Sequence, residues 1–123
     1  MADERYLIAV ASSDGIVVNN HFGHAKTFYV YEVVDDKIEF KEIREVTPVC
    51  QTGEHDDERL NENAEKFADC DYILASKIGD GAAVVLESKG VIPYQIPGII
   101  NESIDKLIRF EKVNKLFDQG RNF

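Results

Sequence analysis

The sequence predicts an α/β domain in which helices pack on the faces of a mixed sheet. Short apolar runs of strand length alternate with helical stripes in the second half of the chain, and such alternation implies right-handed parallel crossovers. Two strand-like segments in the first half are separated only by a two-residue turn, which adds an antiparallel pair. A length of 123 residues suits one domain with a single core.

The first strand is expected at residues 6–11, because a continuous apolar run of this length is typical of a strand buried on both faces. Residues 12–15, Ser-Ser-Asp-Gly, have the chemistry of a turn, since Ser and Asp bond to nearby backbone and Gly tolerates a positive φ. Residues 16–18 add a short extended piece.

A hairpin is expected next. Residues 27–34 are rich in aromatic and β-branched side chains and predict a strand. A tight turn at residues 35–36 leads into a return strand at residues 37–46. Phe40 alternates with charged residues, whereas Ile43 falls on the opposite parity, and this change of phase predicts a β-bulge or a twist. The many charges place the return strand at a sheet edge.

A loop and the first helix follow the hairpin. Pro48 and Gly53 stop regular structure in residues 47–55. Residues 56–68 predict a helix, because apolar side chains recur there at helical spacing. This stripe comprises Leu60, Ala64, Phe67 and Ala68.

Two strands and a helix come after it. A short buried strand is expected at residues 71–75, and a helix at residues 82–89 that Gly90 closes as a C-cap. Residues 91–96 predict a third buried strand, and Pro93 makes it an edge strand because proline cannot donate to the ladder.

The last part of the chain has apolar residues at helical spacing. Pro97-Gly98 is expected to turn, and Asn101 to N-cap a helix. The apolar stripe of this helix comprises Ile104, Leu107 and Ile108. Beyond Glu111 the stripe shifts to Phe110, Val113, Leu116 and Phe117. The tail is therefore either a kinked continuation of the helix or a separate short helix that docks on another surface.

Composition excludes several classes of function. A net charge of −9 disfavours nucleic acid and anionic membrane surfaces, which need clustered Lys and Arg. No apolar run reaches the length that spans a bilayer, which is about 18 residues. The charged N-terminus lacks the apolar region of a signal peptide, so a cytoplasmic location is expected. Two cysteines are too few for a disulfide scaffold and are expected to be free thiols.

The segment His21-Phe22-Gly23-His24-Ala25 lies between two predicted strands and carries two of the three histidines. Imidazole and thiolate are the ligands that borderline and soft metals prefer. The loop after the hairpin contributes Cys50 and His55, so both loops can reach one end of the sheet. Each residue also has a plainer interpretation: His21 as a turn residue, His24 and His55 as solvated side chains, and Cys50 as an inert thiol.

The ordered set of motifs resembles the dinitrogenase iron–molybdenum cofactor biosynthesis family, which includes NifX, NafY and the C-terminal domain of NifB. The residues that carry the resemblance are Ile8-Ala-Val-Ala-Ser12, His21-Phe22-Gly23-His24-Ala25, Phe28-Tyr-Val-Tyr-Glu32, the Cys50 loop, Asp69-Cys70-Asp71 and Ile78-Gly79. It covers about residues 5–110 and leaves residues 111–123 as a C-terminal helical tail outside the cofactor-binding-like domain.

The resemblance implies a ribonuclease H-like three-layer fold with a mixed five-stranded sheet. It also implies a non-catalytic protein that carries an iron–sulfur–molybdenum cluster or its precursor between donor and acceptor proteins. The expected ligands are His21, then Cys50, then His24, with Gly23 between the histidines. Gly79 opens a strand-to-helix turn whose free backbone N–H groups suit an anionic cluster.

Two alternatives remain beside this interpretation, and a third is disfavoured by the sequence. Four nitrogen and sulfur donors, from His21, His24, Cys50 and His55, would also fit tetrahedral Zn²⁺. A metal-free regulatory or interaction module would use the tail stripe for docking. A metal-dependent nuclease needs converging carboxylates, and residues 6–11 contain none. Cys70 adjoins a buried strand and is expected to behave mainly as a small apolar residue.

Overall fold

The computed structural model describes residues 5–48 and 57–120. Five strands form the main sheet in the order β4-β3-β1-β5-β6. They are β1 (Arg5–Ala11), β3 (Thr27–Val34), β4 (Lys37–Glu45), β5 (Tyr72–Ala75) and β6 (Ile92–Gln95). Strand β3 is antiparallel to both β1 and β4, whereas β5 is parallel to β1 and β6 is parallel to β5. The predicted mixed sheet with an early antiparallel hairpin is confirmed.

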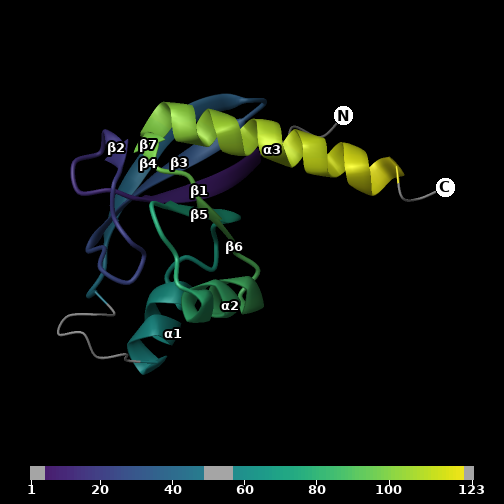
Figure 1. Ribbon diagram of the computed structural model, residues 1–123. Coiled ribbons are helices and arrows are strands. Elements are labelled where there is room, and N and C mark those ends of the chain that lie inside the picture. The colour runs from purple at the N-terminus through teal and green to yellow at the C-terminus, as the bar shows by residue number, and fades with distance from the viewer. Residues whose placement is uncertain (1–4, 49–56, 121–123) are drawn as a thin grey trace.

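Helices cover both faces of the sheet, which gives three layers (Figure 1). Helices α1 (Asp57–Glu65) and α2 (Asp80–Ser88) pack on one face, and α3 (Ile100–Gly120) packs on the other. Alternate residues of β1 serve the two cores: Ala9 and Ala11 face α1 and α2, and Ile8 and Val10 face α3. The prediction that this strand is buried on both faces is therefore confirmed.

The hairpin has the predicted bulge. Val30 pairs with Glu42 but Tyr31 pairs with Phe40, so Lys41 is an extra residue on β4. This inserted residue explains the change of phase between the apolar residues of β4. The turn at Asp35-Asp36 has positive φ at both residues, 50° and 68°, which matches the twist of a two-residue hairpin.

Several predicted helix boundaries are wrong, and α2 begins at Asp80 rather than at residue 82. Helix α1 ends at Glu65. Beyond it the chain forms tight turns with i→i−3 hydrogen bonds: the N–H of Phe67 donates to the carbonyl of Ala64, and the N–H of Ala68 donates to the carbonyl of Glu65. Ala68 is consequently exposed and does not belong to the apolar stripe.

The chain after β6 also differs from expectation. Gly98 does not simply turn: Gly98–Ile99 is strand β7, which pairs antiparallel with β2 (Val17–Val18) in a second, two-stranded sheet. This pairing places the helix start at Ile100, so Asn101 lies inside α3 and is not its N-cap.

Helix α3 is a single helix of 21 residues that continues past Glu111, so the described residues of the tail belong to the same helix. It extends well past the sheet toward the C-terminus (Figure 1). Tyr94 of β6 donates a hydrogen bond to Glu111, and Lys112 forms an ion pair with Asp36 of the hairpin turn. The division at residue 110 remains a prediction, although contacts across it tie the start of the tail to the sheet.

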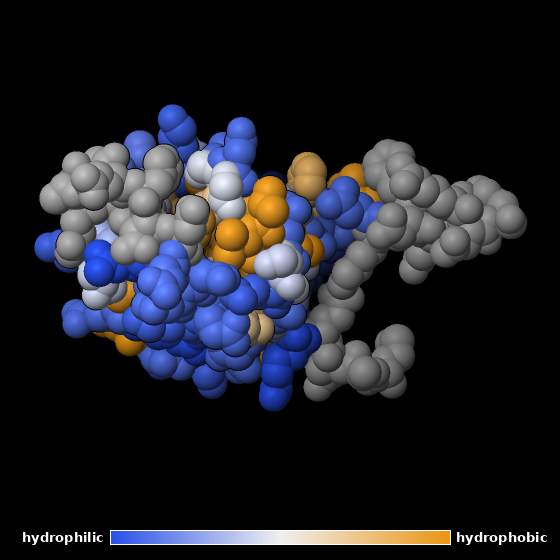
Figure 2. All heavy atoms as spheres, turned by 90° about the horizontal axis from the view of Figure 1, so that it is seen from below, coloured by the Kyte–Doolittle hydropathy of each residue, from blue (hydrophilic) through white to orange (hydrophobic). Residues whose placement is uncertain are grey.

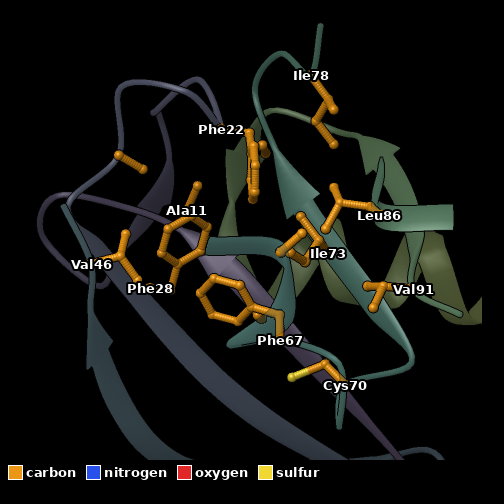
Figure 3. Close-up of a cluster of buried hydrophobic side chains, with 14 of the residues drawn as sticks. Ala11, Phe22, Phe28, Val46, Phe67, Cys70, Ile73, Ile78, Leu86 and Val91 are labelled. Carbon is orange, nitrogen blue, oxygen red and sulfur yellow. The ribbon is translucent and has the colours of Figure 1, made fainter. Parts of the chain in front are cut away.

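The core beneath α1 and α2 is dominated by aromatic packing. The rings of Phe28 and Phe67 lie 4.6 Å apart, and those of Phe22 and Phe28 lie 5.8 Å apart. Figure 3 shows Phe22 and Ile78 at one end of this cluster and Cys70 at the other.

The outer surface on this side is mostly hydrophilic, with a prominent group of hydrophobic atoms near the middle of the view (Figure 2). Among the described residues, no helix is long and apolar enough to cross a membrane.

Candidate metallocluster site

The candidate site lies at one edge of the main sheet. Strands β1, β4, β5 and β6 all run toward this edge, because β4 and β1 are both antiparallel to β3. The loop between β2 and β3, which carries the His motif, enters β3 from the same edge. Ligands of open α/β sheets bind outside the carboxyl ends of the strands, so the motif occupies a favourable position.

The backbone fixes the His motif beside the loop that follows β5. His21 and Lys77 are partners in an isolated parallel bridge. The N–H of Phe22 donates to the carbonyl of Lys77 at 3.0 Å, and the N–H of Ser76 donates to the carbonyl of Asn20 at 3.0 Å. The motif and the β5–α2 loop thus form one continuous edge.

The motif itself is a tight turn with two buried anchors. The N–H groups of His24 and Ala25 both donate to the carbonyl of His21, at 3.1 and 3.0 Å. Phe22 is 2% exposed and Ala25 is fully buried, and both belong to the core cluster beneath α1 and α2. These anchors leave His21 and His24 on the exposed side of the turn.

The two imidazoles lie next to each other. Their ring centres are 5.8 Å apart, with the planes inclined at 62°. Because a metal–imidazole bond is about 2 Å long, two rings that share one ion have centres roughly 4.5–6.5 Å apart, so this pair is within range. In the part of the chain that the structure describes, neither side chain makes a hydrogen bond. Both rings are therefore accessible donors.

Gly79 opens the N-terminus of α2, two residues beyond Lys77. Its φ of −65° and ψ of 156° are ordinary for any residue, and a Cβ at this position would meet nothing within 4 Å. Gly79 is consequently not required by packing or by backbone strain. Its missing side chain leaves the first turn of α2 open, where N–H groups have no intrahelical partner.

Gln95, the last residue of β6, holds this loop in place. Its side-chain oxygen accepts a hydrogen bond from the N–H of Ile78 at 2.6 Å. Ile78 is buried in the same cluster as Phe22, so the loop is fixed by packing as well. Sequence reasoning missed both Gln95 and Lys77, because their roles depend on pairing between segments far apart in the chain.

Cys70 lies away from this edge. It precedes β5, at the strand end opposite to Lys77, and is 3% exposed. Burial, together with the charge of Asp69, raises the pKa of the Cys70 thiol to about 12. A protonated, buried thiol is an apolar packing residue, as expected for Cys70.

Cys50 and His55 lie outside the described residues. Within residues 5–48 and 57–120, no group of three or more His, Cys, Asp or Glu side chains is arranged to hold a metal ion. The described part of the site therefore offers a pair of imidazoles rather than a closed cage.

The fold and this edge define a small three-layer α/β domain with an open, histidine-bearing strand end. A family model described as "Dinitrogenase iron-molybdenum cofactor" matches residues 4–109. The chain belongs to this dinitrogenase iron–molybdenum cofactor family.

Curated relatives carry the name FeMo cofactor biosynthesis protein NifB. The protein from Frankia alni is 35% identical over 107 residues, which are 85% of this chain and 21% of that protein. The protein from Chlorobaculum tepidum is 33% identical over 104 residues, which are 83% of this chain and 24% of that protein. The chain thus spans about a fifth of the length of these relatives.

Solved structures share the fold. A putative NifB protein from Thermotoga has a TM-score of 0.58 at 21% identity, covering 85% of this chain and 88% of that one. A putative dinitrogenase from Methanocaldococcus jannaschii has a TM-score of 0.55 at 14% identity, covering 90% of this chain and 93% of that one.

Proposed function

We propose that this domain binds an iron–sulfur–molybdenum cluster, or a precursor of it, and carries it between a donor and an acceptor protein during metallocofactor biosynthesis. The observation that carries the proposal is the exposed His21–His24 pair beside the open N-terminus of α2. Family membership supports the choice of cargo, since the curated relatives are named for biosynthesis of this cofactor.

The chemistry of the edge suits transfer. Imidazole nitrogen is a borderline ligand that binds iron and molybdenum sites without the permanence of a thiolate cage. His21 is the primary ligand, held by its bridge to Lys77, and His24 is its neighbour across the turn. Cys50 is the third proposed ligand, on sequence grounds. Two or three protein ligands leave most of the cluster surface for the next protein to engage.

The open helix end contributes to the same cargo. Sulfide-rich clusters are anionic and accept hydrogen bonds from backbone N–H groups. Gly79 gives a cluster access to the first turn of α2 because no side chain stands in the way. We propose a binding role without catalysis. We also propose that the domain has a ribonuclease H-like fold, and the strand order of the main sheet supports this proposal.

The proposal is tested by anaerobic titration with isolated iron–molybdenum cofactor, followed by gel filtration and absorption spectroscopy. We expect a coloured complex with one cluster per chain. His21→Ala and Cys50→Ala should each weaken binding at least tenfold, and Gly79→Ala should weaken it without loss of stability. His55→Ala is the matched control and should bind as the unmodified chain does.

Two results would overturn the proposal. The first is the absence of a cluster complex at any concentration. The second is full binding by a chain that carries both His21→Ala and Cys50→Ala. Tight uptake of Zn²⁺ that raises the melting temperature, without any cluster binding, would instead favour a structural zinc protein.

A further inference from the structure

Lys77 stands beside the proposed cargo ligand by virtue of strand register. His21 and Lys77 are bridge partners, and the residues that follow them, Phe22 and Ile78, are both buried in the core beneath α1 and α2. Successive side chains of extended backbone point to opposite sides. His21 and Lys77 therefore share the outer side of this edge, where both are exposed.

The charge of Lys77 is not neutralised by the fold. Six other cations of the described residues are in ion pairs: Arg5 and Lys41 with Glu32, Arg44 with Asp69, Lys89 with Glu65, Arg109 with Asp105, and Lys112 with Asp36. Lys77 forms no ion pair within the part of the chain that the structure describes, and the same holds for Lys26, Lys37, Lys66 and Lys106. Lys77 is distinguished from these by its pairing with His21.

An available cation matters on this chain because of its overall field. The net charge is −9, and Asp80 lies in the first turn of α2, next to Gly79. Both oppose an anionic ligand at the open helix end. An ammonium beside His21 acts at short range, where the Coulomb interaction is strongest.

We propose that Lys77 is a cargo-binding residue that makes the His21 edge select negatively charged clusters over metal cations. This inference rests on the proposed function, since it names the charge class that the site accepts. The ammonium of Lys77 attracts the sulfide-rich surface of a cluster that His21 ligates, and it repels a bare divalent ion that approaches the same imidazoles.

The two probes of the test have opposite charge. One is a synthetic thiolate-capped iron–sulfur cluster of net negative charge, added anaerobically, and the other is Co²⁺ alone. Lys77→Gln should weaken cluster binding about three- to tenfold and reduce its dependence on ionic strength. The same variant should bind Co²⁺ as well as, or better than, the unmodified chain.

Two controls separate a local charge from general effects. Lys37→Gln makes the same change of net charge at the start of β4, at the opposite end of the sheet, and should leave both affinities unchanged. Lys77→Arg retains the positive charge and should retain most of the cluster affinity. Melting temperatures of all variants should agree, because Lys77 is exposed.

The outcomes distinguish the two proposals. If Lys77→Gln binds the cluster as the unmodified chain does while His21→Ala fails to bind, the role of Lys77 is wrong and the carrier proposal stands. If Lys77→Gln weakens the binding of the cluster and of Co²⁺ to the same extent, Lys77 maintains the shape of the loop and does not select ligands by charge. If the unmodified chain binds no cluster, both proposals fail.

Discussion

The side-chain oxygen of Gln95 accepts a hydrogen bond from the backbone N–H of Ile78 at 2.6 Å. This contact joins the last residue of β6 to the loop between β5 and α2. Ile78 follows Lys77, whose carbonyl in turn accepts from the N–H of Phe22 in the His motif. A chain of three adjacent segments thus defines the edge at which the candidate site lies.

Gln95→Ala should destabilise the domain by about 1 kcal/mol, because the N–H of Ile78 loses its acceptor in a partly buried place. Urea unfolding measures the change, and cluster affinity should fall with it. Gln95→Glu keeps an acceptor at the same position and should restore most of the stability. Equal stability of the alanine variant and the unmodified chain would show that the contact is dispensable.

Replacing either of two glycines with alanine should change the free energy of unfolding, but in opposite directions. Gly15 has φ of 76°, and a Cβ there would lie 2.7 Å from the Tyr29 ring, so Gly15→Ala should cost about 1–2 kcal/mol. Gly81 is in the first turn of α2 with nothing within 4 Å of its Cβ. Gly81→Ala should therefore stabilise by about 0.5 kcal/mol. Thermal unfolding of the two variants, compared in one experiment, checks both signs.

The ion pair between Arg44 and Asp69 should make stability depend on pH. The two terminal guanidinium nitrogens, Nη1 and Nη2, donate to the two carboxylate oxygens, each at 2.8 Å, and these bonds lower the pKa of Asp69. A carboxyl whose pKa is lowered in the folded state contributes its full stabilisation above the pKa of the unfolded chain, which is about 4. This stability is lost as the pH falls through the folded value.

The matched comparison is Asp69→Asn. Because the Asp69 side chain is 56% exposed, the variant should lose only about 1 kcal/mol or less at pH 7. The difference from the unmodified chain should shrink as the pH falls below about 4, as followed by urea unfolding at several pH values. A difference that stays constant over that range would contradict the role of the ion pair.

Cys70 should be unreactive until the domain unfolds. Its thiol is buried, with a pKa raised to about 12, so almost no thiolate is present at neutral pH. In a Cys50→Ser background, in which Cys70 is the only cysteine, a thiol reagent should react slowly in buffer and rapidly in denaturant. Fast reaction of the native protein would show that the packing around Cys70 opens readily.

Local patterns predicted most of the fold. The opposite parity of Ile43 indicated the bulge at Lys41, and Gly90, with φ of 82°, closes α2 as expected. One error, at residues 97–101, arose where distant segments meet. Strand β7 exists because Gly98–Ile99 pairs with Val17–Val18, and no signal within residues 97–101 indicates that partner.

The same distinction applies to the site. The motif His21-Phe22-Gly23-His24 was visible from its donor residues, and its position at the carboxyl edge followed from the strand order. Its neighbour Lys77 was not visible, because the bridge to His21 is a tertiary pairing across 56 positions. The family resemblance was confirmed, whereas ligation by these residues stays a proposal.

Phe22 and Ala25 have a consequence for how a guest molecule would be received. Their side chains are held in the core, so the backbone of the His turn is already ordered before anything arrives. Association then loses little conformational entropy at the turn, and the affinity reflects ligation and charge almost alone. Under the proposed function, a bound cluster would therefore be exchanged without folding or unfolding of the His turn itself.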